Sequence, residues 1–434
     1  TGPGGEERKC GKRSRLPFAR AVHTALLFSK ARFSKMRFSK DTLHLNVAQK
    51  AASPYLYDLF GFEVSNLHSK WIHKLRTLIF NEHLSHNEKV CTLESYVDVV
   101  TNISEIKRDI EIAATNDDVE SNAYRLRLES ELTGILKESG HLRDQVEEII
   151  EGLIGDVLVS ENLDAWKGIV LPPVDIRLTQ TPKLLVTSPR GEILRTHDVL
   201  IRPGITIKQR ELIENMLFSE SNLSGLVMDI GGVATFPAVL PLNQSLRWTI
   251  QTAAHEWLHH YLFFHPLGQQ IFSNDQMQTL NETVADLAGR EIGDRVMALL
   301  EESADSKPQT CTDFHQDAIS REHKDSLFSF NQEMHETRLT VDKLLAESKV
   351  EEAEQYMDER RLFFNQNGFN IRKINQAYFA FLGTYAENPA SVSPIGSQVK
   401  TFREFTPSLG SFIKEIRSVS TYSQFIEKLD QLKK

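Results

Sequence analysis

The sequence predicts an α+β protein in which helices predominate around a small mixed sheet. Long stretches carry apolar residues at helical spacing, and a short central region has the alternating or continuous apolar pattern of strands, bounded by Pro and Gly. Of the 434 residues, 40% are apolar and 25% charged, which is ordinary for a globular chain with two or three domains. No run approaches the ~18 consecutive apolar residues of a membrane-spanning helix, so we expect a soluble protein without a transmembrane segment.

The first segment, residues 1–46, is predicted to be a basic tail without fixed structure. Residues 1–40 contain eleven Lys or Arg and two Glu, a net charge of +9, which leaves −18 on the remaining chain. Phe-Ser-Lys recurs every five residues from Phe28 to Lys40, and this mixture of basic and aromatic residues also suits peripheral contact with a membrane. The acidic remainder argues against nucleic-acid binding, which depends on a basic surface.

The three cysteines are far apart in the sequence and odd in number: Cys10, Cys91 and Cys311. No disulfide framework or cysteine-based metal motif follows from this spacing. We therefore expect a reducing compartment, and the cytoplasm in particular.

Residues 47–165 are predicted to form a helical N-terminal region. Apolar residues recur at helical spacing from Leu67 to Ile79, from Leu126 to Leu136 and from Leu142 to Val159. Such stripes are typical of helices that pack in a core.

The central region, 166–300, has a different pattern. After Pro172-Pro173, strands are predicted at Val174 to Leu178, Leu184 to Val186 and Leu226 to Phe236, the last interrupted by Gly231-Gly232. Helices are predicted over 207–218 and 246–264, the second of them closed by Pro266 and Gly268. Residues 301–434 then form a helical C-terminal lobe with loops at Pro389, Pro394 and Pro407.

The most informative motif is His255-Glu256-Trp257-Leu258-His259, an H-E-x-x-H sequence. Residues four apart on a helix share a face, with Cβ atoms about 5–6 Å apart, so two imidazoles there can reach one Zn²⁺. Glu256 is then placed to act as general base toward a zinc-bound water. The apolar residues around the motif indicate a buried helix. Two histidines and a glutamate without partners would be costly to bury there, which disfavours ordinary core histidines.

A catalytic zinc usually has three protein ligands and an open position for water. His265 follows His255 at the spacing of the pattern H-E-x-x-H-x-x-G-x-x-H, but Leu262 stands where that pattern needs Gly for a turn back toward the metal. A continuing helix would carry His265 about 9 Å beyond His259 along its axis. We therefore do not expect His265 to be a ligand.

The other candidate for the third ligand is Glu282, in the segment from Asn281 to Gly289. This segment is predicted to be a second helix that stops at Gly293. Glu282 and Asp286 are four apart and share a face of it.

Together the two motifs resemble those of the gluzincins, the thermolysin- and neprilysin-like zinc peptidases, whose second motif has the form N-E-x-x-x-D or E-x-x-x-D. The resemblance covers about residues 225–294. It implies that His255, His259 and Glu282 hold one Zn²⁺ per chain and that Asp286 orients a ligating imidazole, that of His255. It also implies a zincin-like catalytic core at 166–300 that hydrolyses a peptide or protein substrate, with the C-terminal lobe closing the other side of the cleft.

The resemblance further implies a substrate strand and a residue that stabilises the oxyanion. Leu226 to Phe236 takes the place of the family's edge strand, so Gly232, Val233 and Ala234 are candidate substrate-binding residues; an internal strand with a bulge fits the same sequence equally well. Candidates for the oxyanion are Tyr378 and Tyr385, two turns apart on a helix predicted over 371–385, and further Arg338, His335, His323 and His315.

Two other interpretations of the motifs compete with a peptidase. The chain could be a non-catalytic scaffold or protein-binding module stabilised by zinc; the presence of Glu256 argues against this, because a structural site does not need it. The chain could also be a helical interaction protein in which the motif is accidental, and such a protein would hold no stoichiometric metal.

Overall fold

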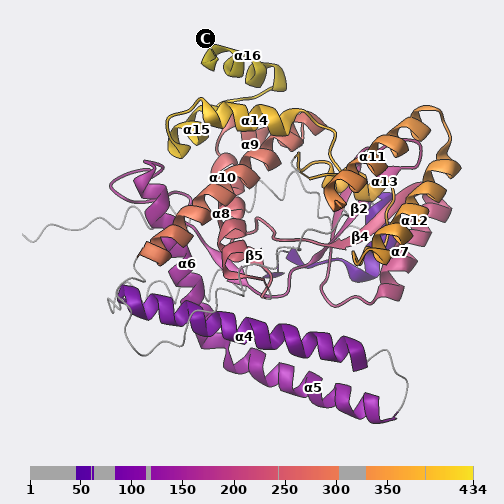
Figure 1. The fold of residues 1–434 in the computed structure, drawn as a ribbon, viewed down its shortest axis with the longest axis horizontal. Coiled ribbons are helices and arrows are strands. Elements are labelled where there is room, and N and C mark those ends of the chain that lie inside the picture. Colours follow the sequence, from indigo (N-terminus) through magenta and orange to yellow (C-terminus); the bar gives the residue numbers. More distant parts are fainter. Residues whose placement is uncertain are drawn as a thin grey trace, which may run out of the picture.

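A computed structural model describes residues 45–59, 61–62, 84–113, 119–242, 244–302, 329–386 and 388–433. It confirms an α+β protein that is mostly helical with little sheet (Figure 1). The predictions for the basic tail, apart from its last two residues, and for the helix from Leu67 to Ile79 lie outside the described residues. The helices are α2 (Val47–Ala52), the short 3-10 helix η2 (Ser53–Tyr55), α4 (His86–Ala113), α5 (Val119–Glu138), α6 (Gly140–Ser160), α7 (Ile207–Ser221), α8 (Leu246–Leu262), α9 (Pro266–Gln269), α10 (Asp275–Glu302), α11 (Phe330–Ala346), α12 (Val350–Gln366), α13 (Gln376–Leu382), α14 (Ile395–Glu404), α15 (Leu409–Ile416) and α16 (Tyr422–Leu432).

The strands form two small sheets. One is antiparallel with the order β3-β2-β4, and the other is a parallel pair, β1-β5. Side chains of the larger sheet alternate between its faces: Leu185 packs with α2 and α7, and Leu184 and Val186 pack with α13. The strands are β1 (Ile176–Leu178), β2 (Lys183–Pro189), β3 (His197–Ile201), β4 (Leu223–Asp229) and β5 (Ala238–Leu240).

Helices α8 and α10 pack against each other at the centre of the molecule (Figure 1). Their apolar faces belong to one hydrophobic core that runs from Leu93 in α4 through α6 to Leu429 in α16. This core crosses both predicted boundaries of the central region, near residues 165 and 300. The helical segments before and after the central region therefore stabilise the same two helices.

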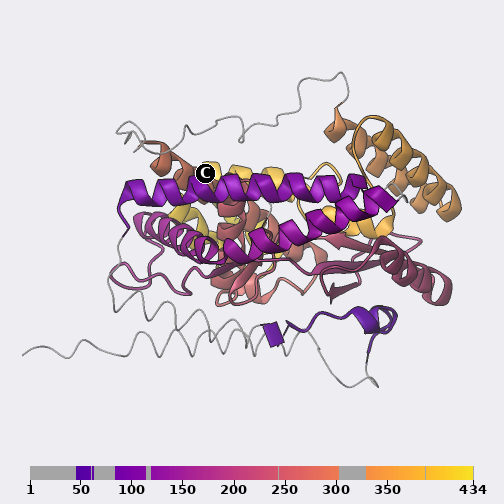
Figure 2. The same cartoon turned by 90° about the horizontal axis from the view of Figure 1, so that it is seen from below.

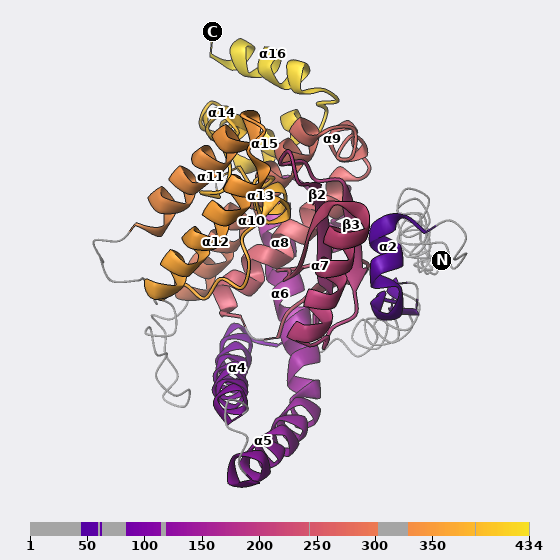
Figure 3. The same cartoon turned by 90° about the vertical axis from the view of Figure 1, so that its right-hand side faces the viewer.

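On the other side of α8 and α10, the antiparallel sheet carries α7 on one face and α13 on the other, with α11 and α12 packed beyond α13 (Figure 3). Helices α4 and α5 form a long hairpin along one side of the molecule (Figure 2). None of the helices in the described ranges combines the length and the apolar composition that crossing a bilayer requires. Cys91 in α4 is disulfide-bonded, which the spacing of the three cysteines did not predict. The compartment of the protein stays a prediction.

The predicted strand from Leu226 to Phe236 is wrong in its second half. Strand β4 ends at Asp229, whose carboxylate pairs with Lys183 and Arg210, and residues 230–237 form a loop. In this loop the backbone of Val233 exchanges hydrogen bonds with Val239 in β5, both at 3.0 Å. The chain thus leaves the larger sheet and joins the smaller one.

Two predicted helix boundaries also differ from the structure. Helix α13 covers only part of the predicted 371–385, because the side chain of Asn375 accepts a hydrogen bond from the Tyr378 amide and begins the helix there. Gly293 does not end a helix. It lies inside α10, where a Cβ would come within 2.4 Å of the Gln251 side chain, so its role is close packing against α8.

Candidate metal centre

Helix α8 carries the H-E-x-x-H motif with its apolar face in the core. The hydroxyl of Ser245 caps the helix by accepting a hydrogen bond from the Trp248 amide. Ala254, Trp257 and Leu258 are among the fully buried residues that hold the helix in place. The opposite face turns His255 and His259 toward a cavity.

Helix α10 supplies the other side of the site. Part of its buried surface packs on α8, and Gly289 lies in this contact: a Cβ there would lie 2.9 Å from the His255 backbone nitrogen. This contact sets the distance between the two helices at the level of the first histidine. Glu282, two turns before Gly289, points into the same cavity.

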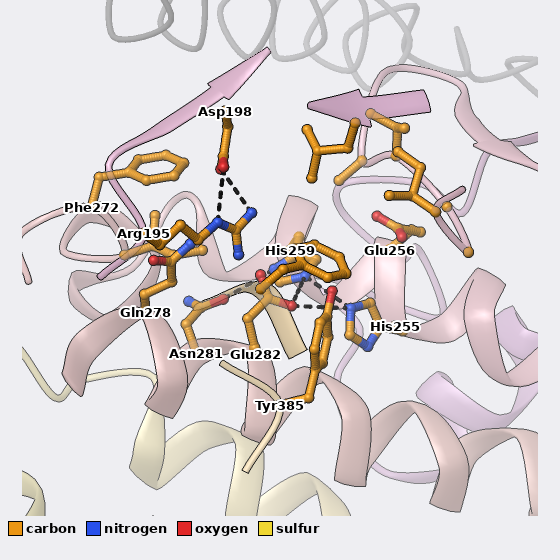
Figure 4. Close-up of a pocket in the computed structure, with 18 of the residues that line it drawn as sticks. Arg195, Asp198, His255, Glu256, His259, Phe272, Gln278, Asn281, Glu282 and Tyr385 are labelled. Carbon is orange, nitrogen blue, oxygen red and sulfur yellow. Dashed lines mark hydrogen bonds and ion pairs between the residues drawn. The ribbon is translucent and has the colours of Figure 1, made fainter. Parts of the chain in front are cut away.

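The side chains of His255, His259 and Glu282 converge on one point (Figure 4). The two Nε2 atoms are 3.0 Å apart, and the Glu282 Oε2 atom lies 3.5 Å from that of His255 and 3.4 Å from that of His259. The three potential ligand atoms all lie within 4.8 Å of one another. This is the one group of three or more such residues found in the described part of the chain, and it contains the three predicted ligands.

Asn281 fixes the ring of His259, a role that the motifs did not predict. The Nδ2 atom of Asn281 donates to the Leu267 carbonyl at 3.4 Å, which leaves its Oδ1 atom to face His259 Nδ1 at 3.0 Å. The Nδ1 atom is then the protonated nitrogen, and Nε2 keeps its lone pair for a metal. The sequence feature that could have indicated this role is the Asn that begins the motif N-E-x-x-x-D.

Charges in the site stabilise one another. Burial lowers the pKa of His255, but a hydrogen bond to Glu282 and the carboxylates of Glu256, Glu282 and Asp286 outweigh it and raise that pKa to about 9. Burial raises the pKa of Glu282, and the two histidines outweigh it, so the pKa lies well below its usual value. The site is therefore built to hold positive charge beside an ionised Glu282.

Glu256 is buried and lines the same cavity, on the side away from Glu282 (Figure 4). The loop that follows β4 approaches its carboxylate closely. A Cβ on Gly232 would lie 2.4 Å from Glu256 Oε1, so only a glycine leaves the carboxylate in its present position. Gly232, Val233 and Ala234 all line the cavity beside Glu256.

The two candidate tyrosines have different surroundings. Tyr385, in the loop after α13, lines the cavity, and its ring stands next to the histidines and Glu282 (Figure 4). Burial, followed by the charge of Glu282, raises its pKa well above the usual value, so the phenol stays protonated. Tyr378, a residue of α13, packs against the sheet and α11–α12 and does not line the cavity.

The other candidates for the oxyanion are not brought to the site. Arg338 bonds Asp342 and the Ala390 carbonyl, and His335 is exposed on α11. His315 and His323 lie outside the described residues. His265 packs against Tyr261, with ring centroids 4.8 Å apart, and does not join the metal-binding group.

Asp286 lines the cavity but bonds Arg290, one turn later in α10, rather than His255. Its charge contributes to raising the pKa of His255. Asp286 therefore affects His255 through its charge and does not orient the ring by the predicted hydrogen bond.

Arg195, just before β3, is a cavity residue that the sequence did not reveal. Its Nε and Nη2 atoms donate to the Asp198 carboxylate at 2.9 and 2.7 Å, and its guanidinium lies over the Phe381 ring. It stands across the cavity from Glu256 (Figure 4). No sequence motif around Arg195 predicts this position, because the fold places the residue in the cavity.

The cavity that contains the site is large, about 1420 Å³, and runs between α8–α10 and the sheet. Pockets for small molecules usually hold about 300–1,000 Å³. Comparison of the chain with protein-family models, curated proteins and solved structures found no match.

Proposed function

We propose that this protein is a zinc-dependent hydrolase of peptide bonds. The observation that carries the proposal is the convergence of His255, His259 and Glu282, from two packed helices, on one point of a large cavity that also holds the buried carboxylate of Glu256. Two imidazoles and one carboxylate are the ligand set of many catalytic zinc sites.

The residues present fit a zinc ion. The donor atoms are nitrogen and oxygen, they lie close enough together to share one ion, and Asn281 leaves the Nε2 atom of His259 available. When bound, zinc would lower the pKa of a coordinated water and polarise a substrate carbonyl. Structural zinc sites have four protein ligands, whereas this group has three among the described residues, which favours catalysis over a purely structural role.

The protein groups around the ligands match the needs of amide hydrolysis. Glu256 would accept a proton from the attacking water and pass it to the leaving amine. Tyr385, protonated and facing the ligands, would donate a hydrogen bond to the oxyanion that forms from the substrate carbonyl. Each role uses a group that lines the cavity.

An extended peptide suits the cavity better than a small metabolite, because of its size and because of the edge strand β3. Tyr57 donates to the Leu200 carbonyl and Arg202 donates to that of Tyr55, so even-numbered residues of β3 direct their backbone groups outward. By this alternation the backbone of Asp198, a residue that lines the cavity, is directed to the same side of β3 as that of Leu200, beyond the bonds to residues 55–57. A substrate strand would pair there rather than at Val233, whose amide and carbonyl are already bonded.

We also propose that α8, α10 and the adjoining strands form a zincin-like core. The support is the packing of the H-E-x-x-H helix directly against the helix that supplies Glu282. The competing interpretation is a zinc-stabilised scaffold, which predicts metal binding without hydrolysis.

The test combines metal content with hydrolysis. We expect one zinc per chain after dialysis, zinc-dependent cleavage of a quenched fluorescent peptide pool, and a loss of at least about 10³-fold in cleavage for Glu256→Gln with zinc retained. Glu282→Ala should retain zinc much more weakly. Glu220→Gln, an exposed change at the end of α7, is the matched control and should behave as wild type.

Each result separates the interpretations. Zinc binding without cleavage of any pool, in wild type as in Glu256→Gln, would favour the scaffold. A folded wild type that takes up no zinc when zinc is supplied would make the two motifs accidental.

A further inference from the structure

The segment between α8 and α10 places exposed apolar side chains on the rim of the cavity. Phe264 and Phe272 are 39% and 58% exposed, and both line the cavity with Ile271. Several large apolar side chains that stay partly exposed on the wall of one cavity indicate contact with a ligand.

The rim has a defined position relative to the metal-binding group. Phe272 lies on the side of Arg195 and Gln278, opposite Glu256 (Figure 4). It shortly precedes α10, in which Asp275 and Glu282 are seven residues apart and both line the cavity. At 1.5 Å per residue, this part of the helix spans about 10 Å.

An extended peptide advances about 3.3 Å per residue, so about three residues bridge the distance from Glu282 to the rim. Over this distance α10 offers the side chain of Gln278, an amide suited to a peptide backbone.

We propose that Phe272, with Phe264 and Ile271, forms a specificity subsite for a bulky apolar side chain about three residues from the scissile bond, on the side of the bond away from Glu256. The substrate class is thus an extended peptide with an aromatic or large aliphatic residue at that position. The proposal rests on the proposed function where it is tested by peptide cleavage, but not where it is tested by peptide binding.

The test uses a peptide pool in which each position is randomised in turn, with cleavage products identified by mass spectrometry. We expect wild type to prefer Phe, Trp, Leu or Met over Ser or Glu by about tenfold at one position about three residues from the cut. Phe272→Ser should remove this preference, by lowering kcat/KM for the peptides with an apolar residue there about tenfold, toward that for their Ser counterparts. Phe405→Ser is the matched control, because Phe405 is 49% exposed and lies outside the cavity.

A second readout does not need hydrolysis. Zinc-loaded Glu256→Gln should bind a labelled Phe-containing peptide about tenfold more tightly than its Ser counterpart, and adding Phe272→Ser should equalise the two. If such selective binding occurs without any cleavage by wild type, the subsite stands and the hydrolytic function falls.

Three results would overturn the subsite. One is an apolar preference that persists in Phe272→Ser. Another is a wild type with no apolar preference in cleavage or in binding. The third is loss of binding to phosphatidylcholine vesicles by Phe272→Ser with unchanged peptide selectivity, which would make the rim a lipid contact.

Discussion

Among single residues, the two candidate tyrosines differ in their position relative to the candidate metal ligands. Tyr385 faces His255, His259 and Glu282, whereas Tyr378, a residue of α13, packs in the core against the sheet. We expect Tyr385→Phe to lower the rate of peptide hydrolysis by about 10²–10³-fold, because one hydrogen bond to the oxyanion is lost. Tyr378→Phe should change the rate little, and both variants should keep their zinc. Equal rates for the two variants would remove Tyr385 from the mechanism.

Gly232 is the second residue whose effect should be local. An added methyl group would meet the end of the flexible Glu256 side chain, so it would displace the carboxylate rather than unfold the loop. We expect Gly232→Ala to lower kcat/KM by about 10²-fold, as a misplacement of about 1 Å can, without changing zinc content or the melting temperature. Gly191→Ala, where a Cβ meets nothing within 4 Å, is the control. Full activity in Gly232→Ala would show that the position of Glu256 is not critical.

At the scale of elements, the packing of α8 against α10 determines the site. A Cβ at Gly289 would meet backbone atoms of α8 at 2.9–3.0 Å, which cannot rotate away. We expect Gly289→Ala to lower the free energy of unfolding by about 1–3 kcal/mol and to weaken zinc binding, since it moves His255 away from Glu282. Urea unfolding and a zinc titration would measure both effects.

The control for this change lies in another helix of the same core. A methyl group added at Gly155 in α6 would meet nothing within 4 Å, so Gly155→Ala should raise the free energy of unfolding by about 0.5–1 kcal/mol. If both variants were equally stable, α8 and α10 would tolerate a wider separation than the structure has.

The sequence predicts elements well where periodicity is strong and contacts poorly where they depend on packing. The helices at 246–264 and around Glu282 follow from apolar spacing, and the convergence of His255, His259 and Glu282 follows from the motifs on them. Strand β3 escaped prediction because only Val199, Leu200 and Ile201 of it are apolar. Gly293 was misjudged because a glycine used for close packing looks the same in sequence as one that ends a helix. Arg195 comes to the cavity only through the register of β3 with β2.

At the scale of the whole molecule, zinc would join two helices that anchor the main core. Helix α8 packs against β5 and α6, and α10 packs against α6 and α14–α16. We expect saturating zinc, at about 100 times its dissociation constant, to raise the free energy of unfolding by about 2.7 kcal/mol, and a chelator to reverse this. Thermal unfolding with and without chelator would measure the effect, and Glu282→Ala should show much less of it. An unchanged melting temperature in a wild type shown to bind zinc would contradict the linkage.

The stabilisation by zinc should depend on pH through His255. In the metal-free protein its pKa is about 9, so near pH 7 the ring carries a proton that zinc must displace, whereas Glu282, with a lowered pKa, is already ionised. We therefore expect zinc affinity to rise about tenfold per pH unit from pH 7 and to level off above pH 9. Titration with a competing chelator at several pH values would measure this, and calorimetry in buffers of different ionisation enthalpy should show about one proton released at pH 7. A zinc affinity independent of pH between 7 and 9 would contradict this prediction. It would mean that the His255 ring is already neutral in the metal-free protein, so that zinc displaces no proton from it.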